Sequence, residues 1–386
     1  MRLSSVPEKT AGLVAELSAA CARLGHGLHT QSSANLADLV RVMNAYYTNL
    51  IEGHNTRPRD IERALLGDLD DDIPRRDLQL EAAAHVRLQA TLDQLAINDE
   101  LPEPASKVFI SQLHKDFYSD APESMLRVEG SNSTFVMKPG EWRSQSAHDV
   151  TVGRHVPPSS EVVERFMQRF SEAYLLDSVK IGQRLMLIPA AHHRFNYIHP
   201  FPDGNGRVSR LMSHAMVHWA GIGAHGLWSV SRGLARGLES RSEYSRMMDY
   251  ADTPRQGDLD GRGNLSEKAL QEFTRWFLEV CLDQVQFMTN QFELDRLDAR
   301  YDRLVAGHDT LKPEASALLK EALRSGQFER GQAARITGLP PRTAQRVLQD
   351  VIAEGLLAST TPKGAVSLRF PASTLESLFP RLYSEV

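Results

Sequence analysis

The sequence predicts a mainly α-helical protein with a small amount of β structure. Apolar residues recur at helical spacing over residues 36–51, 181–198 and 207–219, whereas strand-like patterns are confined to short segments. A chain of 386 residues is long enough for about two or three domains with a substantial core. We expect three regions: an N-terminal helical region (1–110), a helical core (111–304) and a small C-terminal domain (310–386).

The first strongly patterned helix is expected at about residues 36–53. Ser33 and Asn35 are candidate N-caps, and Gly53 is a natural C-terminal stop. Glu52 lies at the C-terminal end, where the helix dipole disfavours a carboxylate by a few tenths of a kcal/mol to about 1 kcal/mol. Such an unfavourably placed charge often has a partner elsewhere in the fold.

The next segment, at about residues 138–155, is expected to form a short β-hairpin. It contains a Lys138-Pro139-Gly140 turn and alternating valines, and Pro157-Pro158 precede a helix expected from about Ser160. An edge strand here can align an extended peptide by main-chain hydrogen bonds. The alternative is a plain surface hairpin.

Residues 181–219 are predicted to form two helices joined by a short loop. Pro200 prevents the first helix from continuing, and the second helix begins at about Gly206. The connecting sequence, residues 199–210, reads HPFPDGNGRVSR. Gly204, Asn205 and Gly206 let the backbone approach a ligand, and the free N–H groups of the next helical turn make an anion site.

The side chains of this loop are those that phosphate chemistry needs. Arg207 and Arg210 are three residues apart on one helix face, where guanidinium groups can bind phosphate oxygens bidentately. Asp203 is a candidate Mg²⁺ ligand, and His199 can accept a proton at neutral pH. Phe201 is expected to be an apolar peg that fixes the loop. The loop therefore predicts an enzyme that handles nucleotide phosphates.

The same twelve residues fill every specified position of the signature HPFx(D/E)GNGRxxR, so the sequence resembles the Fic family. The resemblance implies a Fic-type helical core that transfers AMP from Mg²⁺-bound ATP to a Ser, Thr or Tyr hydroxyl. It assigns His199 as the general base, Asp203 as the Mg²⁺ ligand, residues 204–206 as the anion site, and Arg207 and Arg210 as holders of the leaving phosphates. The intact GNGR sequence argues against relatives of the Doc kinase type.

The resemblance also gives Glu52 a partner. Thr48, Glu52 and Gly53 match the inhibitory pattern (S/T)xxxE(G/N) of Fic proteins. In resembling proteins this glutamate pairs with the second arginine of the loop, here Arg210, and blocks productive seating of the ATP γ-phosphate. Resembling proteins also carry a hairpin flap before the loop, which aligns the target and covers the adenine.

The end of the chain has a different character. A long helical pattern covers about residues 265–304, and a linker follows at 306–313. After the linker come three short helical patterns, at 314–324, 331–337 and 341–354, and then a hairpin around residues 362–364. This resembles a winged helix–turn–helix with Arg342, Gln345 and Arg346 on the outward side of its third helix.

The partner of this C-terminal domain is left open between DNA and protein. From Thr310 onward the chain holds ten Lys and Arg against seven Asp and Glu, a small excess for offsetting phosphate repulsion. In the preceding helical stretch, Phe292, Asp295, Arg296 and Arg300 mix charge with apolar side chains. They would dock this domain to the core or to a second subunit in a homodimer.

Composition and cysteine content argue against several other classes of protein. The formal charge of −5 does not indicate bulk nucleic-acid affinity, and no apolar run approaches the length of a membrane span. Without a signal-peptide pattern we expect a cytoplasmic protein with no membrane partner. Cys21 and Cys281 are expected to be buried thiols rather than a disulfide framework or part of a zinc site.

We therefore expect a protein adenylyltransferase that uses ATP and Mg²⁺, modifies a target protein or itself, and is inhibited by Glu52. One alternative is a hydrolase that removes AMP from a protein and uses Glu52 to position water. Another is a DNA-binding regulator whose core senses a nucleotide. UTP and CDP-choline remain open as donors, because no residue identifies the base pocket.

Overall fold

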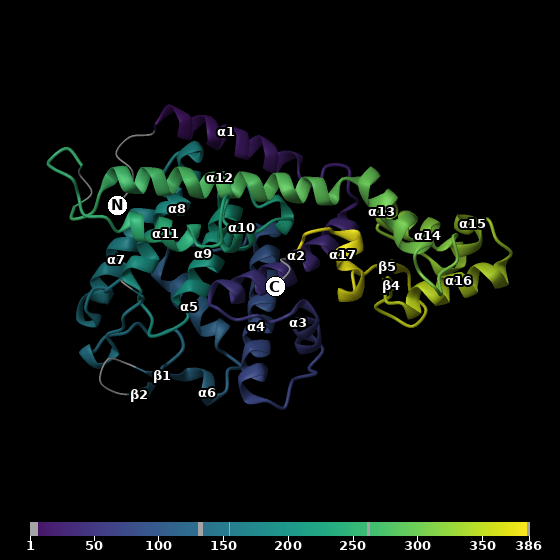
Figure 1. Ribbon diagram of the computed structural model, residues 1–386, viewed down its shortest axis with the longest axis horizontal. Coiled ribbons are helices and arrows are strands. Elements are labelled where there is room, and N and C mark those ends of the chain that lie inside the picture. Colours follow the sequence, from purple (N-terminus) through teal and green to yellow (C-terminus); the bar gives the residue numbers. More distant parts are fainter. Residues whose placement is uncertain (1–6, 130–133, 154, 261–262, 384–386) are drawn as a thin grey trace. The chain divides into compact units, whose positions relative to one another are not determined.

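The computed structural model describes residues 7–129, 134–153, 155–260 and 263–383 (Figure 1). The chain forms two compact units, the first comprising Met1–Ala22 and Asn44–Val285 and the second comprising Arg23–Met43 and Gln286–Val386. Helices α2 (Thr30–Ile51) and α12 (Glu267–Phe292) contribute residues to both units. The three-region division expected from the sequence stays a prediction.

The first unit is mainly helical, as predicted. Its remaining helices are α1 (Glu8–Arg23), α3 (Pro58–Leu65), α4 (Ile73–Ile97), α5 (Lys107–Phe117), α6 (Glu123–Leu126), α7 (Val163–Tyr174), α8 (Ile181–Ile198), α9 (Asn205–Trp219), α10 (Ser231–Arg236) and α11 (Glu243–Ala251). Short 3₁₀ turns are η1 (Ser146–His148), η2 (Ser160–Val162), η3 (Leu176–Ser178) and η4 (Ala224–Gly226). The strands are β1 (Arg127–Glu129) and β2 (Thr134–Val136).

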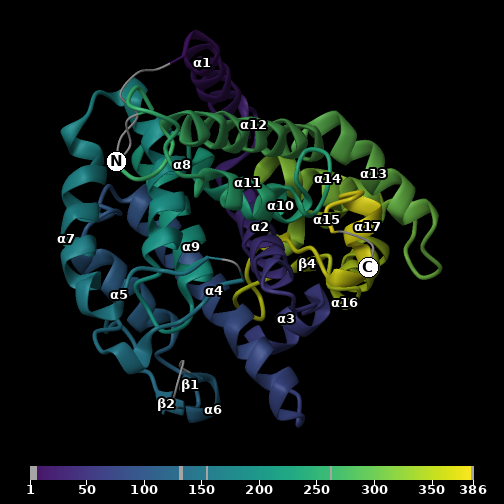
Figure 2. The same ribbon diagram turned by 60° about the vertical axis from the view of Figure 1, so that its left-hand side comes forward.

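Helix α9 is the centre of this unit. It packs against α8, α4 and α5 (Figure 2). Val208, Leu211 and Met212 on α9 are fully buried, and burial of such side chains contributes about 1.5–3 kcal/mol each. The two helices predicted around the loop are confirmed, because α8 ends at Ile198 and α9 begins at Asn205.

The predicted position of the hairpin is wrong. The antiparallel hairpin is β1–β2, with Arg127 opposite Val136, rather than a pair of strands within residues 138–155. Residues 138–155 instead form a loop with the 3₁₀ turn η1 and a single bridge between Val152 and His155, and Arg154 lies outside the described residues. Pro139 and Gly140 interrupt strand pairing in this loop, whereas Thr134-Phe135-Val136 is a β-branched and aromatic run.

The second unit contains the C-terminal elements. They are α13 (Leu294–Ala306), α14 (Ala315–Ser325), β3 (Gln327–Phe328), η5 (Arg330–Gln332), α15 (Ala333–Thr337), α16 (Pro341–Ala353), β4 (Leu357–Ala358), β5 (Val366–Leu368), η6 (Ala372–Thr374) and α17 (Leu375–Leu378). The three strands form an antiparallel sheet of order β3-β5-β4. The three helices and the hairpin predicted here are confirmed, while β3 was not predicted. The winged-helix identification stays a prediction.

The residues predicted to contact DNA or a partner lie on α16. Arg342 and Arg346 are exposed and Gln345 is half-buried, because Ala344 and Val347 occupy the buried face of this helix. Their role as contacts remains a prediction, as does the choice between DNA and protein.

Two of the predicted docking residues on the preceding stretch are used inside the second unit. Arg300 Nη1 donates to the carbonyls of Gln291 and Leu378, both at 2.9 Å. Phe292 packs edge-on against Phe379. Both contacts hold α12, α13 and α17 together within that unit, while Asp295 and Arg296 are exposed.

Two smaller expectations concern the whole chain. Cys21 and Cys281 are both buried free thiols, as predicted. Among the described residues, every helix is too short or too polar to span a bilayer.

Candidate active site

His199 begins the loop between α8 and α9 in an unusual backbone conformation. It is the C-cap of α8 with φ 50° and ψ 61°, a left-handed geometry that non-glycine residues adopt rarely. Arg143 holds this geometry, because its Nε donates to the carbonyl of His199 (2.6 Å) and its Nη2 donates to the carbonyl of Ile198 (2.9 Å). Arg143 therefore positions the histidine through its backbone.

Arg143 is itself fixed by the segment that follows it. Its side chain is 1% exposed, and its Nη1 donates to Ser160 Oγ (2.9 Å) and lies 3.3 Å from Asp149 Oδ1. Asp149 in turn accepts from the backbone N–H of Ser160 (2.7 Å). The loop at 138–155 thus supports the loop at 199–210. Sequence reasoning missed Arg143, because no local pattern links it to a loop 56 residues away.

The imidazole of His199 is suited to accept a proton. Burial, together with the charges of Arg143 and His155, lowers the pKa of His199 to about 4. The ring is therefore neutral at pH 7. It lines a cavity of about 460 Å³ whose walls also include Glu52, Gly206 and Arg210.

The residues after His199 close the loop and leave the start of α9 open to a ligand. Asn205 closes it from both sides, because its Oδ1 accepts from Phe201 N (2.9 Å) and its Nδ2 donates to Phe201 O (2.8 Å). Phe201 is fully buried and stacks on His114 with ring centroids 3.8 Å apart, so it is the apolar peg that the sequence predicts. Gly204 is the N-cap of α9 at φ 78° and supplies no side-chain cap. The N–H groups of the first turn thus receive no side-chain cap from Gly204 and could bind an anion.

Tyr118, on the chain just after α5, forms the floor beneath Gly204. A Cβ at Gly204 would lie 2.6 Å from Tyr118 Oη, so both the close approach and the positive φ require glycine there. Asp203 stands beside it, with its side chain 50% exposed and its Oδ2 3.3 Å from Tyr118 Oη. A half-exposed carboxylate next to an anion site fits a Mg²⁺ ligand, because Mg²⁺ retains several waters and takes few protein oxygens.

Arg207 is buried between α9 and α4. Its Nη1 donates to Tyr118 Oη (2.9 Å) and lies 3.1 Å from Glu81 Oε1 on α4. Burial raises the pKa of Glu81 to about 7, against the opposing charge of Arg207. Within the described part of the chain, Arg207 Nε is buried without a hydrogen-bond partner, which leaves a donor for an acceptor such as a phosphate oxygen. Sequence reasoning missed Glu81 and Tyr118, whose surroundings gave no motif.

Arg210 is bound by the end of α2. Its Nε donates to Thr48 Oγ1 (2.7 Å), and its Nη2 donates to Glu52 Oε1 (2.5 Å). The Arg210 side chain is 1% exposed, whereas that of Glu52 is 30% exposed. Burial opposes ionisation of Glu52, but the charges of Arg210 and Arg207 outweigh it and lower the pKa of the carboxyl. The contact that the resemblance implies is therefore present, with Glu52 ionised at neutral pH.

The Glu52 carboxylate also lies across the anion site. A Cβ added at Gly206 would meet Glu52 Oε1. The first turn of α9 and Arg210 thus share one carboxylate, which lies where another anion would approach the start of the helix. Gly53 follows at φ 86°, the left-handed stop predicted for this helix end.

Opposite the α9 face of the cavity, the described part of the 138–155 loop is attached to the end of α11. His155 Nδ1 lies 3.0 Å from Asp252 Oδ2, and His193 Nε2 lies 2.8 Å from Asp252 Oδ1. The second nitrogen of His155, Nε2, is 2.9 Å from the carbonyl of Tyr197. These contacts, which the sequence did not reveal, fix the rim of the cavity next to His199.

This chain is similar to known proteins of one family. A family model described as Fic/DOC matches residues 104–217. A relative named Protein adenylyltransferase Fic in Nematostella vectensis is 30% identical over 177 residues, which are 46% of this chain and 37% of the relative. Another of that name in Drosophila erecta is 35% identical over 82 residues, which are 21% of this chain and 16% of the relative. The chain thus spans well under half the length of these relatives.

A solved structure supports the fold over nearly the whole chain. A Fic family protein from Desulfovibrio desulfuricans covers 96% of this chain and 99% of its own, with a TM-score of 0.55 and 16% sequence identity. At that identity the likeness concerns the fold alone. The family match, the complete loop at 199–210 and this shared fold agree that residues 104–217 are a Fic domain.

Proposed function

We propose that this protein is an adenylyltransferase that transfers AMP from ATP to a hydroxyl group of a target protein or of itself. The observation that carries the proposal is that His199, Gly206 and Arg210 line one cavity of about 460 Å³. A proton acceptor, an anion site and a phosphate-binding cation therefore face the same space. The names of the relatives support the same class of reaction.

In this reaction the target hydroxyl oxygen attacks the α-phosphorus of ATP, and the bond from that phosphorus to the β-phosphate oxygen breaks. Pyrophosphate leaves, and the hydroxyl proton passes to His199, which is neutral because burial lowers its pKa to about 4. The first-turn N–H groups of α9 stabilise negative charge on the α-phosphate. Arg207 and Arg210 bind the oxygens of the leaving pyrophosphate.

Asp203 would hold the Mg²⁺ that accompanies the nucleotide. Its half-exposed carboxylate supports this role, because the ion needs one protein oxygen together with phosphate oxygens and water. When bound, Mg²⁺ neutralises part of the phosphate charge. Arg207 Nη1, 3.8 Å from Asp203 Oδ2, keeps the carboxylate turned toward the anion site.

In the resting protein, Glu52 inhibits the reaction. It pairs with Arg210 and lies where phosphate oxygens must bind, so a productively bound γ-phosphate has to displace it. The displacement is feasible because the Glu52 side chain is 30% exposed and can leave the site without a change in α9. Activation therefore requires movement of the end of α2 or loss of the carboxylate.

A second candidate is the reverse reaction, hydrolysis of AMP from a modified protein. It is favoured by one feature, the presence of the ionised Glu52 carboxylate in the same cavity as His199. A carboxylate in that position can orient a water molecule toward a phosphorus atom. For the second unit we retain both partner classes, because the exposed Arg342 and Arg346 suit DNA phosphates and acidic protein surfaces equally.

The test is incubation of wild type, Glu52→Gly and His199→Ala with Mg²⁺ and ATP labelled at either the α- or the γ-phosphate. Transfer of AMP predicts protein-bound label from α-labelled ATP alone, strongest in Glu52→Gly and absent in His199→Ala. Label from γ-labelled ATP would indicate a kinase and contradict the proposal. Loss of label from a pre-adenylylated target in wild type, but not in Glu52→Gly, would identify the hydrolase instead.

A further inference from the structure

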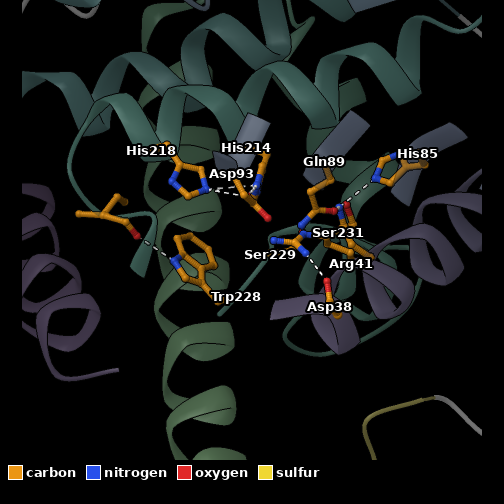
Figure 3. A network of polar contacts seen from close by, with 12 residues as sticks. Asp38, Arg41, His85, Gln89, Asp93, His214, His218, Trp228, Ser229 and Ser231 are labelled. Carbon is orange, nitrogen blue, oxygen red and sulfur yellow. Dashed lines mark hydrogen bonds and ion pairs between the residues drawn. The ribbon is translucent and has the colours of Figure 1, made fainter. Parts of the chain in front are cut away.

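A second cluster of ionisable side chains lies on the same two helices, away from the cavity. Asp93 on α4 faces His214 and His218 on α9 (Figure 3). All three side chains are buried, with exposures of 0% for Asp93, 3% for His214 and 6% for His218. They do not line the cavity described above, and the proposed reaction does not use them.

The three facing atoms form a closed triangle. Asp93 Oδ1 is 2.6 Å from His214 Nε2 and 3.0 Å from His218 Nε2, and the two Nε2 atoms are 3.2 Å apart. His214 and His218 are four residues apart on α9, the spacing that places two imidazoles side by side on a helix face. Figure 3 shows both rings turned toward the Asp93 carboxylate.

Hydrogen bonds account for two sides of this triangle, because each histidine can donate an Nε2 proton to Asp93 Oδ1. The third side, between the two Nε2 atoms, is then a close approach of two N–H groups with no hydrogen bond between them. A cation between the three atoms would instead accept a lone pair from each of them, which the three atoms are close enough to supply together.

The distances fit a single transition-metal ion. Nitrogen and oxygen ligands at about 2.0–2.1 Å from Zn²⁺ lie about 3.0–3.4 Å from one another, depending on the coordination geometry. The observed separations of 3.0 and 3.2 Å lie within this range, and the separation of 2.6 Å between Asp93 Oδ1 and His214 Nε2 would have to lengthen to reach it. Two imidazoles and one carboxylate are a donor set that suits zinc rather than magnesium or calcium, which prefer oxygen ligands.

The chain after α9 is shaped to cover this cluster. A Cβ at Gly223 would collide with the His218 ring, and a Cβ at Gly226 would lie 2.8 Å from Asp93 Oδ2. Between these glycines, Ala224 and His225 adopt positive φ values of 44° and 54°, which residues other than glycine rarely adopt. The turn η4 also contacts α4. Rare backbone geometry thus brings this turn against the carboxylate and the His218 ring.

We propose that Asp93, His214 and His218 bind a zinc ion that fastens α4 to the C-terminal half of α9. Three protein ligands leave a fourth position for a water molecule. The bound ion neutralises the buried carboxylate and stabilises the helix that carries Arg207 and Arg210. Its role is structural and does not depend on the proposed transfer reaction.

The test uses the untagged full-length protein, stripped with a chelator, returned to buffer and titrated with zinc alone. Bound zinc is measured by mass spectrometry after equilibrium dialysis. We expect one zinc ion per chain in wild type and in two controls, His199→Ala in the loop and His225→Ala in the covering turn. We expect no zinc ion in His218→Gln, and zinc should raise the melting temperature of wild type but not of this variant.

A second variant keeps the test decisive if His218→Gln folds poorly. His218→Cys retains a zinc ligand and should retain one equivalent. With Co²⁺ in place of zinc, this variant should gain a thiolate-to-cobalt charge-transfer band that wild type lacks, which identifies residue 218 as a ligand. The proposal would be overturned if wild type bound no more zinc than a folded His218→Gln protein. It would also be overturned if the cobalt-loaded His218→Cys protein lacked the charge-transfer band.

Discussion

Helices α4 and α9 meet at two places that use the same kinds of side chain in opposite ways. At the start of α9, Arg207 and Arg210 pair with Glu81 and Glu52, and the Glu52 side chain is 30% exposed. Toward the end of α9, Asp93 pairs with two histidines, and no side chain of this cluster is more than 6% exposed. The difference in access decides what each group of charges can do.

The open end could exchange partners, because a phosphate entering the cavity would replace a carboxylate with another anion. The closed end cannot, because moving the histidines away would leave the Asp93 carboxylate buried without its hydrogen-bond donors, at a cost of about 3–5 kcal/mol. A paired acid and base can therefore exchange its partner for a ligand where one side chain reaches solvent. Where neither side chain reaches solvent, the pair only holds the two helices together. Substitutions at the two ends should separate effects on activity from effects on stability.

The largest expected difference concerns stability. Asp93→Asn keeps the shape of the side chain but replaces the charged acceptor of two buried histidine N–H groups with an uncharged one, so it should lower the free energy of unfolding by about 2–3 kcal/mol. Glu52→Gln, the matched change at the open end, weakens one such hydrogen bond and should cost about 1 kcal/mol, because the amide oxygen still accepts from Arg210 and the side chain is 30% exposed. Chemical denaturation of the two variants measures both values. Equal losses in the free energy of unfolding would contradict the distinction between the exchangeable pairs at the start of α9 and the closed cluster at its end.

A smaller effect is expected from Glu81 as the pH changes. With its pKa raised by burial to about 7, Glu81 is mostly protonated at pH 6 and ionised at pH 8. The ionised form competes with phosphate for Arg207, so ATP should bind more weakly at pH 8, by up to about tenfold. Glu81→Gln should remove this part of the pH dependence while retaining that of the nucleotide. Titration calorimetry at both pH values measures the difference, and identical pH profiles for variant and wild type would refute the role of Glu81.

The same raised pKa gives a stability trend with a definite sign. The folded protein keeps a proton on Glu81 up to about pH 7, whereas an unfolded glutamate loses it near its ordinary pKa of 4.5. Ionisation of Glu81 therefore destabilises the folded state. The free energy of unfolding should fall for this reason as the pH rises from about 4.5 to 7. Glu81→Gln removes the trend.

The smallest effect is expected from Thr48. Its Oγ1 accepts from Arg210 Nε, and Thr48→Val removes this hydrogen bond with little change in shape. One such bond contributes about 1 kcal/mol, so release of Arg210 should raise AMP transfer by about fivefold at most. Thr56→Val is the matched control, because Thr56 is also buried but accepts from Asn49 instead. A similar rise in both variants would indicate general loosening rather than release of Arg210.

The sequence was most informative where function depends on a contiguous loop. The helices on either side of residues 199–210 were predicted correctly, because apolar periodicity, Pro200 and the glycines act locally. The hairpin was predicted at 138–155 but its strands are β1 and β2, which end at Val136, since both parts of the sequence contain short runs with strand-like character.

The residues that the sequence did not reveal act across long separations. Arg143 reaches His199, Glu81 reaches Arg207, and Asp93 reaches His214, each from an element far away in the chain. Their local surroundings are ordinary loop and helix, so only the packing of α4 and α9 and of the 138–155 loop brings them together. A single sequence gives the spacing of His214 and His218 but not the carboxylate opposite them.

The central claim is that Glu52 controls AMP transfer by holding Arg210, and a double-variant experiment tests it most directly. Initial rates of label transfer from α-labelled ATP are measured at saturating Mg²⁺ for wild type, Glu52→Gly, Arg210→Ala and the double variant. We expect Glu52→Gly to raise the rate by about tenfold or more over wild type, and to have no such effect when Arg210 is already alanine. An equal rise in both backgrounds would show that Glu52 acts independently of Arg210 and would contradict the account.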